Sequence, residues 1–215
     1  MGGSWGVARW NLVSAYVLSN YSRVPCCIRR CDLARLRNRS NLSARGHTAH
    51  EEKLRLLREF TARFATDEEI SAWDEHVTAN PNGGNLLQSA SFASVKAKHG
   101  WKPRYVVYEG RTILEGKEAP FASYNLILEK SVPALGKVWY AIKGPDVNNV
   151  EEIPAVMAAN KALIDQHKLG VFLVKIEPDI LADEQKSAFL AKAGLKKAFN
   201  IQPNDSTAVL DTDKS

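Results

Sequence analysis

The chain has 215 residues, of which 45% are hydrophobic and 25% are charged, so its composition is that of a globular protein long enough to bury a sizeable core. Its formal net charge of +5 is uneven: residues 1–50 hold eight Arg, no Lys and one Asp, whereas the rest holds 21 basic and 23 acidic residues. A nearly neutral body excludes a DNA-binding role argued from overall charge.

Residues 1–50 therefore differ from the remainder, and we expect them to be a disordered, Arg-rich segment. Three interpretations stay open. The segment has the Arg-rich, acid-poor composition of a transit peptide, or residues 10–18 form the core of a weak signal peptide, or it is upstream sequence before a start near residues 51–58. The run at 10–18 is too short to span a bilayer. We expect one domain over residues 51–215.

The three cysteines, Cys26, Cys27 and Cys31, all lie in the Arg-rich segment. Their odd number and their absence from the body argue against a disulfide framework and favour a reducing compartment. Neither a nearby His nor a second cysteine pair accompanies them, so we predict no metal site.

The first half of the body predicts helices separated by strong turn signals. A helix begins near residue 52, and residues 60–64 read as a first strand. Thr66 and Glu69 form a capping box that starts a helix with Ile70, Trp73 and Val77 on its buried face. A turn follows at 80–84. The next helix has candidate caps Ser89 and Ser91, a buried face with Phe92 and Val95, and a stop at Gly100.

The second half alternates between strand and helix patterns. We predict strands at 105–108, 121–129 and 138–142, with turns at 109–111 and 133–136. A helix over 151–168 accepts Pro154 in its first turn, and the apolar run at 171–176 predicts a strand buried on both faces. A helix at 183–193 and a strand at 206–210 complete the order. This pattern indicates an α/β domain with a mixed sheet flanked by helices.

Four pieces of the body occur in an order that resembles one family. Gln88 and Phe92 to Lys96, followed by Gly100 to Pro103, are similar to the pattern Q-x-x-x-W-x-x-V-K…G-W-x-P. Tyr140 to Pro145 is similar to Y-x-x-K/R-G-P. The strand at 171–176 runs into Glu177-Pro178, and residues 201–211 are similar to I-Q-P…V-L-D-L. Over residues 60–211 the chain resembles the FemABX family of peptidoglycan-bridge aminoacyltransferases.

The resemblance implies a fold and a reaction. The family's fold is a tandem of two GNAT-like (acetyltransferase-like) domains, and residues 51–215 match the first. The implied reaction is aminoacyl transfer from aminoacyl-tRNA, a co-substrate, to the stem peptide of lipid II or UDP-MurNAc-pentapeptide, with no cofactor. Because aminoacyl-tRNA would be bound through a second domain, we expect this chain to bind the precursor and to be inactive alone. Because the sequence contains no stretch that could span a membrane, we expect a cytoplasmic protein working at most at the inner membrane face.

The same resemblance implies four site residues. Lys96 corresponds to the family lysine that meets the precursor diphosphate, and Lys143 adds charge to the same pocket. Tyr140 is a candidate hydrogen-bond partner of the substrate. Glu177 is the candidate catalytic residue, as proton acceptor or as orienting acid. Phe92 and Phe172 stand where Trp and, in some relatives, Tyr occur.

Two alternatives compete with this interpretation. One is a non-catalytic half-domain that binds the precursor or a partner chain. The other is an acyl-CoA-dependent GNAT acetyltransferase, which needs a Gln/Arg-x-x-Gly-x-Gly/Ala loop for the pyrophosphate, and residues 51–215 contain no such run. The histidines His76 and His99 are interpreted as solvated residues on helix surfaces.

Overall fold

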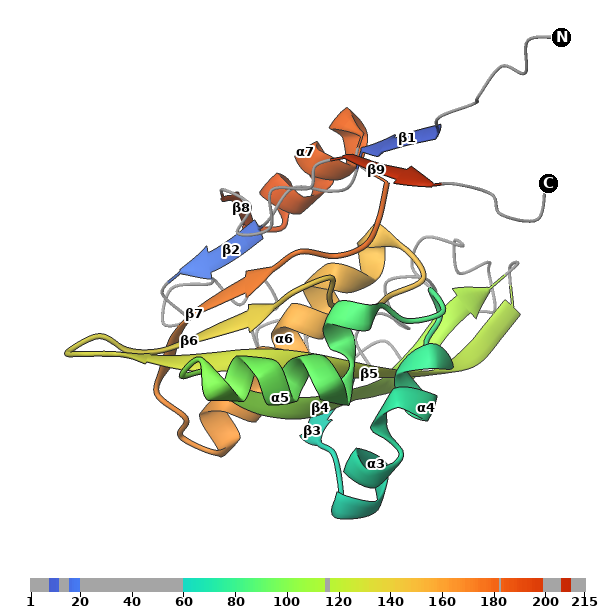
Figure 1. Cartoon of the computed structure of the whole chain (residues 1–215). Coiled ribbons are helices and arrows are strands. Elements are labelled where there is room, and N and C mark those ends of the chain that lie inside the picture. The colour runs from blue at the N-terminus through green and yellow to red at the C-terminus, as the bar shows by residue number, and fades with distance from the viewer. Residues whose placement is uncertain are drawn as a thin grey trace, which may run out of the picture.

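A computed structural model describes residues 8–11, 16–19, 60–114, 117–181, 183–198 and 206–209. Within these ranges a mixed sheet has the strand order β3-β4-β5-β6-β7-β2-β8, and helices lie on both of its faces (Figure 1). The prediction of an α/β domain with a mixed sheet is confirmed. The expected helix from residue 52 and the three cysteines lie outside the described residues.

The chain enters the body through β3 (Thr61–Phe64), α3 (Asp67–Ser71) and α4 (Trp73–Thr78). The capping box is present, since the Thr66 side chain accepts from the Glu69 amide and the Glu69 side chain accepts from the Thr66 amide. The structure has two short helices where one was predicted, with Ala72 between them. Trp73 and Val77 are buried, as expected, while Ile70 is only partly buried.

A short 3-10 helix, η2 (Leu86–Gln88), leads into α5 (Ala90–Lys98). Ser89 caps α5 by accepting from the Phe92 amide, so the alternative cap at Ser91 is wrong. The predicted buried face is also partly wrong, because Val95 is 51% exposed and Ala93 is the residue that is fully covered. A small side chain at this point lets the helix approach the sheet closely.

A long antiparallel ribbon forms the middle of the sheet. β4 (Lys102–Leu114) pairs with β5 (Lys117–Val132) along its whole length. The predicted turn at 109–111 is wrong: Glu109, Gly110 and Arg111 are strand residues that face Ala122, Phe121 and Pro120. The turn was predicted from Gly110 and its immediate neighbours. Hydrogen bonding of these residues to β5 overrides that local preference and keeps them in the strand.

The last part of the sheet contains its parallel pair. β6 (Gly136–Ala141) runs antiparallel to β5 and parallel to β7 (Val171–Ile176), and the crossover contains η3 (Val150–Glu152) and α6 (Ile153–Gln166). Pro154 lies in the first turn of α6, as predicted. Since β6 and β7 are parallel, their carboxyl ends lie at the same edge of the sheet.

The sheet separates two hydrophobic cores, because neighbouring residues of a strand point to opposite faces. Trp139 and Ala141 of β6 belong to the core under α6, whereas Tyr140 and Ile142 belong to the core under α4 and α5. Figure 1 shows α5 and α6 on opposite sides of the sheet. Tyr140 therefore points to the α5 side.

Two further strands extend the main sheet beyond β7, and one helix and a separate two-stranded sheet accompany them. β2 (Tyr16–Ser19) pairs with β7 and with β8 (Lys196–Lys197), and β1 (Ala8–Asn11) pairs with β9 (Ser206–Val209) in a separate two-stranded sheet. α7 (Glu184–Lys192) precedes β8, capped by Asp183. β1 and β2 differ from the disorder expected over residues 1–50, and β2 places part of that segment inside the main sheet.

Candidate functional site

The sequence-predicted residues Tyr140, Lys143 and Glu177 lie at the carboxyl ends of β6 and β7. In the parallel register Tyr140 is opposite Lys175 and Ala141 is opposite Ile176. Lys143 follows β6 by two residues and Glu177 directly follows β7. The carboxyl edge of parallel strands is where α/β sheets usually bind ligands.

Tyr140, Lys175 and Glu177 form a buried polar cluster on the α5 side. The Tyr140 hydroxyl donates to Glu177 Oε2, and Lys175 Nζ donates to Glu177 Oε1 at 2.8 Å. Lys175 Nζ also lies 5.1 Å from the centre of the Tyr140 ring. Burial, and then the neighbouring Glu177 carboxylate, raise the pKa of Tyr140. The phenol therefore stays protonated and acts as a donor.

Lys143 lies on the loop that joins β6 to η3, in a left-handed backbone conformation with φ of 49°. Its Nζ is 3.6 Å from Asp179 Oδ1, and Asp179 Oδ2 accepts from Asn85 Nδ2 at 3.3 Å. The Glu177 amide donates to the carbonyls of Ala141 and Gly144, at 3.0 Å each. These bonds hold the loops after β6 and β7 side by side.

Gln88 fills the gap where β5 and β6 separate. The pairing of β5 with β6 ends at Leu128 and Tyr140. Two residues beyond this pair, the side chain of Gln88 lies between Leu126 and Ile142. Its Oε1 accepts from the Leu126 amide at 2.6 Å, and its Nε2 donates to the carbonyls of Leu126 and Ile142. With 2% of its surface exposed, this amide substitutes for a strand's peptide group at the base of the site.

The same base leaves little room for a side chain at Gly144. A Cβ there would lie 3.3 Å from both Asn125 Oδ1 and Gln88 Nε2, which are fixed by their own hydrogen bonds. Glycine at this position thus follows from the close approach of buried polar groups.

Asp146 is a buried carboxylate in the loop after β6. Its Oδ1 accepts from the Asn82 amide at 3.1 Å, and its own amide donates to Asn125 Oδ1 at 2.8 Å. Burial raises the pKa of Asp146 to about 6; the Asn82 bond opposes this shift and the nearby charge of Asp179 adds to it. Protonation of Asp146 near pH 6 would weaken the tie between this loop and the turn at 80–84.

Lys96 lies near the end of α5, whereas the other predicted site residues lie on or just after β6 and β7. Its Nζ is 5.0 Å from the centre of the Phe92 ring on the same helix, α5. The Lys96 carbonyl accepts from the Trp101 amide, and the Trp101 ring is 6.3 Å from the ring of Tyr140, centre to centre. Trp101 therefore connects the end of α5 with Tyr140. Of the two histidines, His76 stacks on Tyr124 and His99 is exposed.

Sequence reasoning missed three charged residues of this region, Lys175, Asp146 and Asp179. A signal existed for Lys175: it interrupts an apolar strand two residues before Glu177, so both side chains point to the same face. Asp146 and Asp179 lie in loops, where no periodicity reveals direction. The predicted burial of β7 on both faces is partly wrong, since Phe172 and Leu173 are half-buried.

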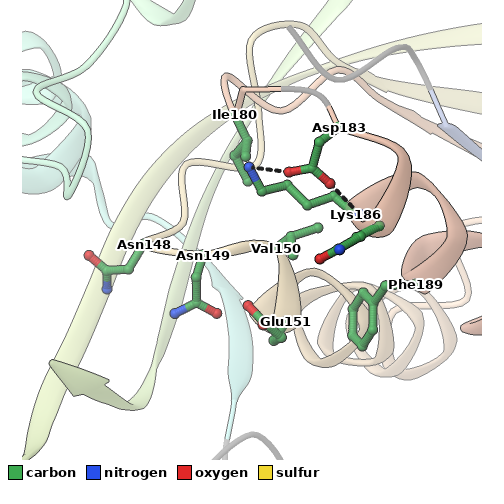
Figure 2. A pocket seen from close by; sticks show the side chains of 9 residues that line it. Asn148, Asn149, Val150, Glu151, Ile180, Asp183, Lys186 and Phe189 are labelled. Atoms are coloured by element: carbon green, nitrogen blue, oxygen red, sulfur yellow. Dashed lines mark hydrogen bonds and ion pairs between the residues drawn. The ribbon is translucent and has the colours of Figure 1, made fainter. Parts of the chain in front are cut away.

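A pocket of about 440 Å³ lies near the same edge of the sheet, between η3 and α7 (Figure 2). It is lined by both polar and apolar side chains, among them Asn149, Glu151, Lys186 and Phe189. None of the four sequence-predicted site residues lines it.

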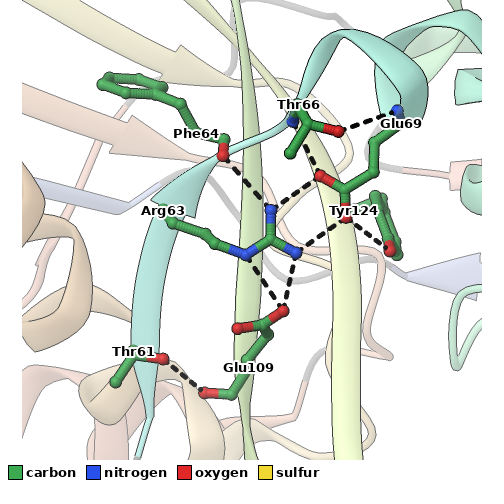
Figure 3. A network of polar contacts seen from close by, with 7 residues as sticks. All are labelled: Thr61, Arg63, Phe64, Thr66, Glu69, Glu109 and Tyr124. Carbon is green, nitrogen blue, oxygen red and sulfur yellow. Dashed lines mark hydrogen bonds and ion pairs between the residues drawn. The ribbon is translucent and has the colours of Figure 1, made fainter.

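The polar network in Figure 3 stabilises the fold and belongs neither to the cluster of Tyr140, Lys175 and Glu177 nor to the pocket between η3 and α7. Arg63 of β3 donates to both oxygens of Glu69 at 2.7 Å and to Glu109 Oε1 at 2.8 Å. The hydrogen bonds from Arg63 lower the pKa of Glu69 to about 2. The network fastens the start of α3 to the edge of the sheet.

Within the described ranges, no group of three or more His, Cys, Asp and Glu side chains has the arrangement of a metal site. No helix in the same ranges has the length and apolar character that a membrane span needs. A scan against protein-family models finds no match to the chain, and a search of curated proteins finds none either.

Proposed function

We propose that this chain binds a peptidoglycan precursor, lipid II or UDP-MurNAc-pentapeptide, and presents its stem peptide for aminoacyl transfer from aminoacyl-tRNA. One observation carries the proposal: the hydrogen bond from Tyr140 to Glu177 joins two motifs that are separated by more than thirty residues in the sequence. The order of antiparallel strands, crossover helix and parallel strand also supports the GNAT-like first domain that the family resemblance implies.

The transfer joins an amine to an activated ester. The stem-peptide amine attacks the ester carbonyl, a C–N bond forms and the C–O bond to the tRNA breaks. The amine loses one proton, and the leaving tRNA oxygen takes up one proton to become a hydroxyl. Positioning both substrates is the main requirement of such a reaction. We assign Tyr140 and Glu177 to orienting the stem peptide, because both oxygens of Glu177 already accept hydrogen bonds.

The cations of the site are assigned to the diphosphate. Lys143 Nζ lies 3.6 Å from Asp179, which is longer than a hydrogen bond and leaves its donors available to a phosphate oxygen. Lys96, at the end of α5, provides the second charge.

Titration calorimetry of the full chain with UDP-MurNAc-pentapeptide tests this function. We expect saturable binding that weakens at least about tenfold in Lys96→Ala and in Lys143→Ala, since each loses a charge-assisted contact. Lys98→Ala removes a neighbouring charge from the same helix and should leave the affinity within about twofold. Absence of binding by a folded chain contradicts the proposal.

A non-catalytic half-domain, which binds the precursor but takes part in no transfer, is the second candidate, and the engagement of both Glu177 oxygens favours it. A turnover assay with lipid II and aminoacyl-tRNA separates the two. Product that forms only when a chain binding aminoacyl-tRNA is added supports the transferase, whereas binding without product in both assays supports the half-domain. Product formed by this chain alone contradicts the expectation that it is inactive alone.

A further inference from the structure

The hairpin formed by β5 and β6 projects beyond its neighbours in the sheet. β4 begins at Lys102, which pairs with Glu129, so β5 continues past β4 for the three residues up to Val132, a length of about 10 Å. On the other side, the first pair between β6 and β7 joins Lys137 to Val171. Figure 1 shows this hairpin reaching beyond the end of α5. Its tip is therefore one of the outermost parts of the described chain.

The tip of the hairpin is apolar and has a defined shape. Residues 132–136 have the sequence Val-Pro-Ala-Leu-Gly, without a charged or polar side chain, and Leu135 is 64% exposed. The Leu135 amide donates to the Val132 carbonyl at 3.1 Å. Gly136 has a φ of 109°, and a Cβ there would lie 2.5 Å from the carbonyl oxygen of Gly170. An ordered turn thus presents a large apolar side chain to the outside of the molecule.

Lysines flank the tip on both faces of the hairpin. On the α5 side, Lys130 Nζ lies 5.1 Å from the centre of the Trp101 ring. On the α6 side, Lys137 Nζ lies 3.4 Å from Glu129 Oε1, and that carboxylate is 4% exposed. Three more exposed lysines lie on the segments beside the base of the hairpin: Lys98 at the end of α5, Lys102 at the start of β4 and Lys168 in the turn after α6. The apolar tip is therefore surrounded by positive charge.

This combination fits an anionic lipid surface better than a strand added by a protein partner. Pro133 and the charged Lys130 are of the types that disfavour pairing at a strand edge. A lipid surface accepts an apolar side chain in its interfacial layer, and its phosphate groups attract lysines. Trp101, partly buried beneath Lys130, is of a type that is enriched at the level of lipid head groups.

We propose that the β5–β6 hairpin docks this protein on an anionic lipid bilayer. Leu135 enters the layer of head groups, and the lysines on the two faces of the hairpin contact lipid phosphates. The contact uses none of the residues Lys96, Tyr140, Lys143 and Glu177, so it does not depend on the proposed binding of a peptidoglycan precursor.

Vesicle flotation of the full chain tests the proposal with two lipid compositions. One vesicle is phosphatidylcholine alone, the other is an equimolar mixture of phosphatidylcholine and phosphatidylglycerol, and neither contains lipid II. We expect the chain to float with the anionic vesicles at low salt and not with the neutral ones, and binding to decline as the salt concentration rises. The eight Arg of residues 1–50 are common to all variants, so differences between variants report on the hairpin.

Two pairs of matched variants locate the contact. Leu135→Asn should weaken binding at least about threefold, because an apolar side chain no longer enters the interface, whereas Leu86→Asn should change it less than about twofold. Leu86 is the suitable control because it is 78% exposed and lies on η2. Lys130→Gln should also weaken binding at least about threefold, whereas Lys117→Gln, at the opposite end of β5, should change it less than about twofold.

Equal effects within either pair of variants overturn the proposal, as do equal binding to the two kinds of vesicle and absence of binding to both. Lys143→Ala, which should lose affinity for UDP-MurNAc-pentapeptide, should keep its vesicle binding. Failure of the lipid contact can therefore be distinguished from failure of the proposed function.

Discussion

Two buried glutamates, Glu129 and Glu177, have similar partners and different settings. Glu129 accepts from the Trp139 indole at 2.9 Å and pairs with Arg104 at 3.0 Å. Glu177 accepts from the Tyr140 hydroxyl and pairs with Lys175 at 2.8 Å. Each carboxylate thus has an aromatic donor and a paired cation, Glu129 has a second cation in Lys137 at 3.4 Å, and both residues are less than 9% exposed.

The difference is how the partners are brought together. Glu129 lies inside the sheet, opposite Trp139 on β6 and opposite Lys102 on β4, so strand register alone determines its neighbours. Glu177 follows the last residue of β7, and its amide bonds to the carbonyls of Ala141 and Gly144. A carboxylate inside a ladder stabilises the sheet, whereas one beyond its end borders loops that can contact a ligand. The comparison can be tested by breaking each network.

The largest effect is expected from Glu129→Ala. It leaves Arg104 and the Trp139 indole without their acceptor, and removing one member of a buried ion pair costs about 3–5 kcal/mol of unfolding free energy. Urea denaturation measures this change. The control is Glu118→Ala on the same strand, whose exposed pair with Arg111 should contribute less than about 1 kcal/mol. Equal losses in the two variants contradict a structural role of Glu129.

Single changes in the second network should cost less. Lys175→Met and Glu177→Gln are each expected to lower the unfolding free energy by about 1–3 kcal/mol, because each leaves a buried polar partner unsatisfied. The double variant should lose less than the sum of the two, since neither charge then remains. A double-mutant cycle in urea measures the coupling, and strict additivity would show that the pair does not interact.

Acidic pH should change the contributions of Glu129 and Asp146 to stability in opposite directions. Burial opposes ionisation of Glu129, but the hydrogen bonds from Arg104 and Trp139 outweigh it and lower its pKa, so its contribution to stability is lost as the pH falls below the ordinary range of Glu. The pKa of Asp146 is raised to about 6, so the folded state binds its proton more tightly than the unfolded state. Stability should then fall as the pH rises from about 4 to about 6, by at most about 1.4 kcal/mol per pH unit.

Asp146→Asn isolates the contribution of this carboxylate. The variant keeps an oxygen that can accept from the Asn82 amide and cannot ionise. Urea midpoints between pH 4 and pH 7 should therefore decline less steeply than those of the unchanged chain. Identical pH profiles would mean that Asp146 titrates at its ordinary pKa.

The smallest effect is expected from removing single hydroxyl groups. Tyr140→Phe loses the bond to Glu177, and Tyr108→Phe loses the 2.9 Å bond to Asn160 on the opposite face of the sheet. Each should lower the unfolding free energy by about 1 kcal/mol. Only Tyr140→Phe should also weaken binding of UDP-MurNAc-pentapeptide in calorimetry. Equal effects of both variants on binding would remove Tyr140 from the proposed site.

Local chemistry made several parts of the structure predictable. The Thr66 and Glu69 capping box, the Ser89 cap and Pro154 in the first turn of α6 depend on residues within one helical turn. Glycines with positive φ follow α5, α6 and α7, as at Gly100, because these positions favour residues without a Cβ. The strand of residues 171–176 is recognisable from its apolar run.

Tertiary structure alone decided the continuous β4–β5 ribbon, the insertion of Gln88 between two separating strands and the pairing of Lys143 with Asp179. Gln88 and Lys143 meet partners more than thirty positions away, and the far end of the ribbon pairs Lys102 with Glu129. No short-range pattern encodes such pairings. The sequence by itself determined the capped starts of α3 and α5, the ends of α5, α6 and α7, and which strand residues share a face. The partner that each buried charge meets was decided by packing, because that choice depends on the register and path of the whole chain.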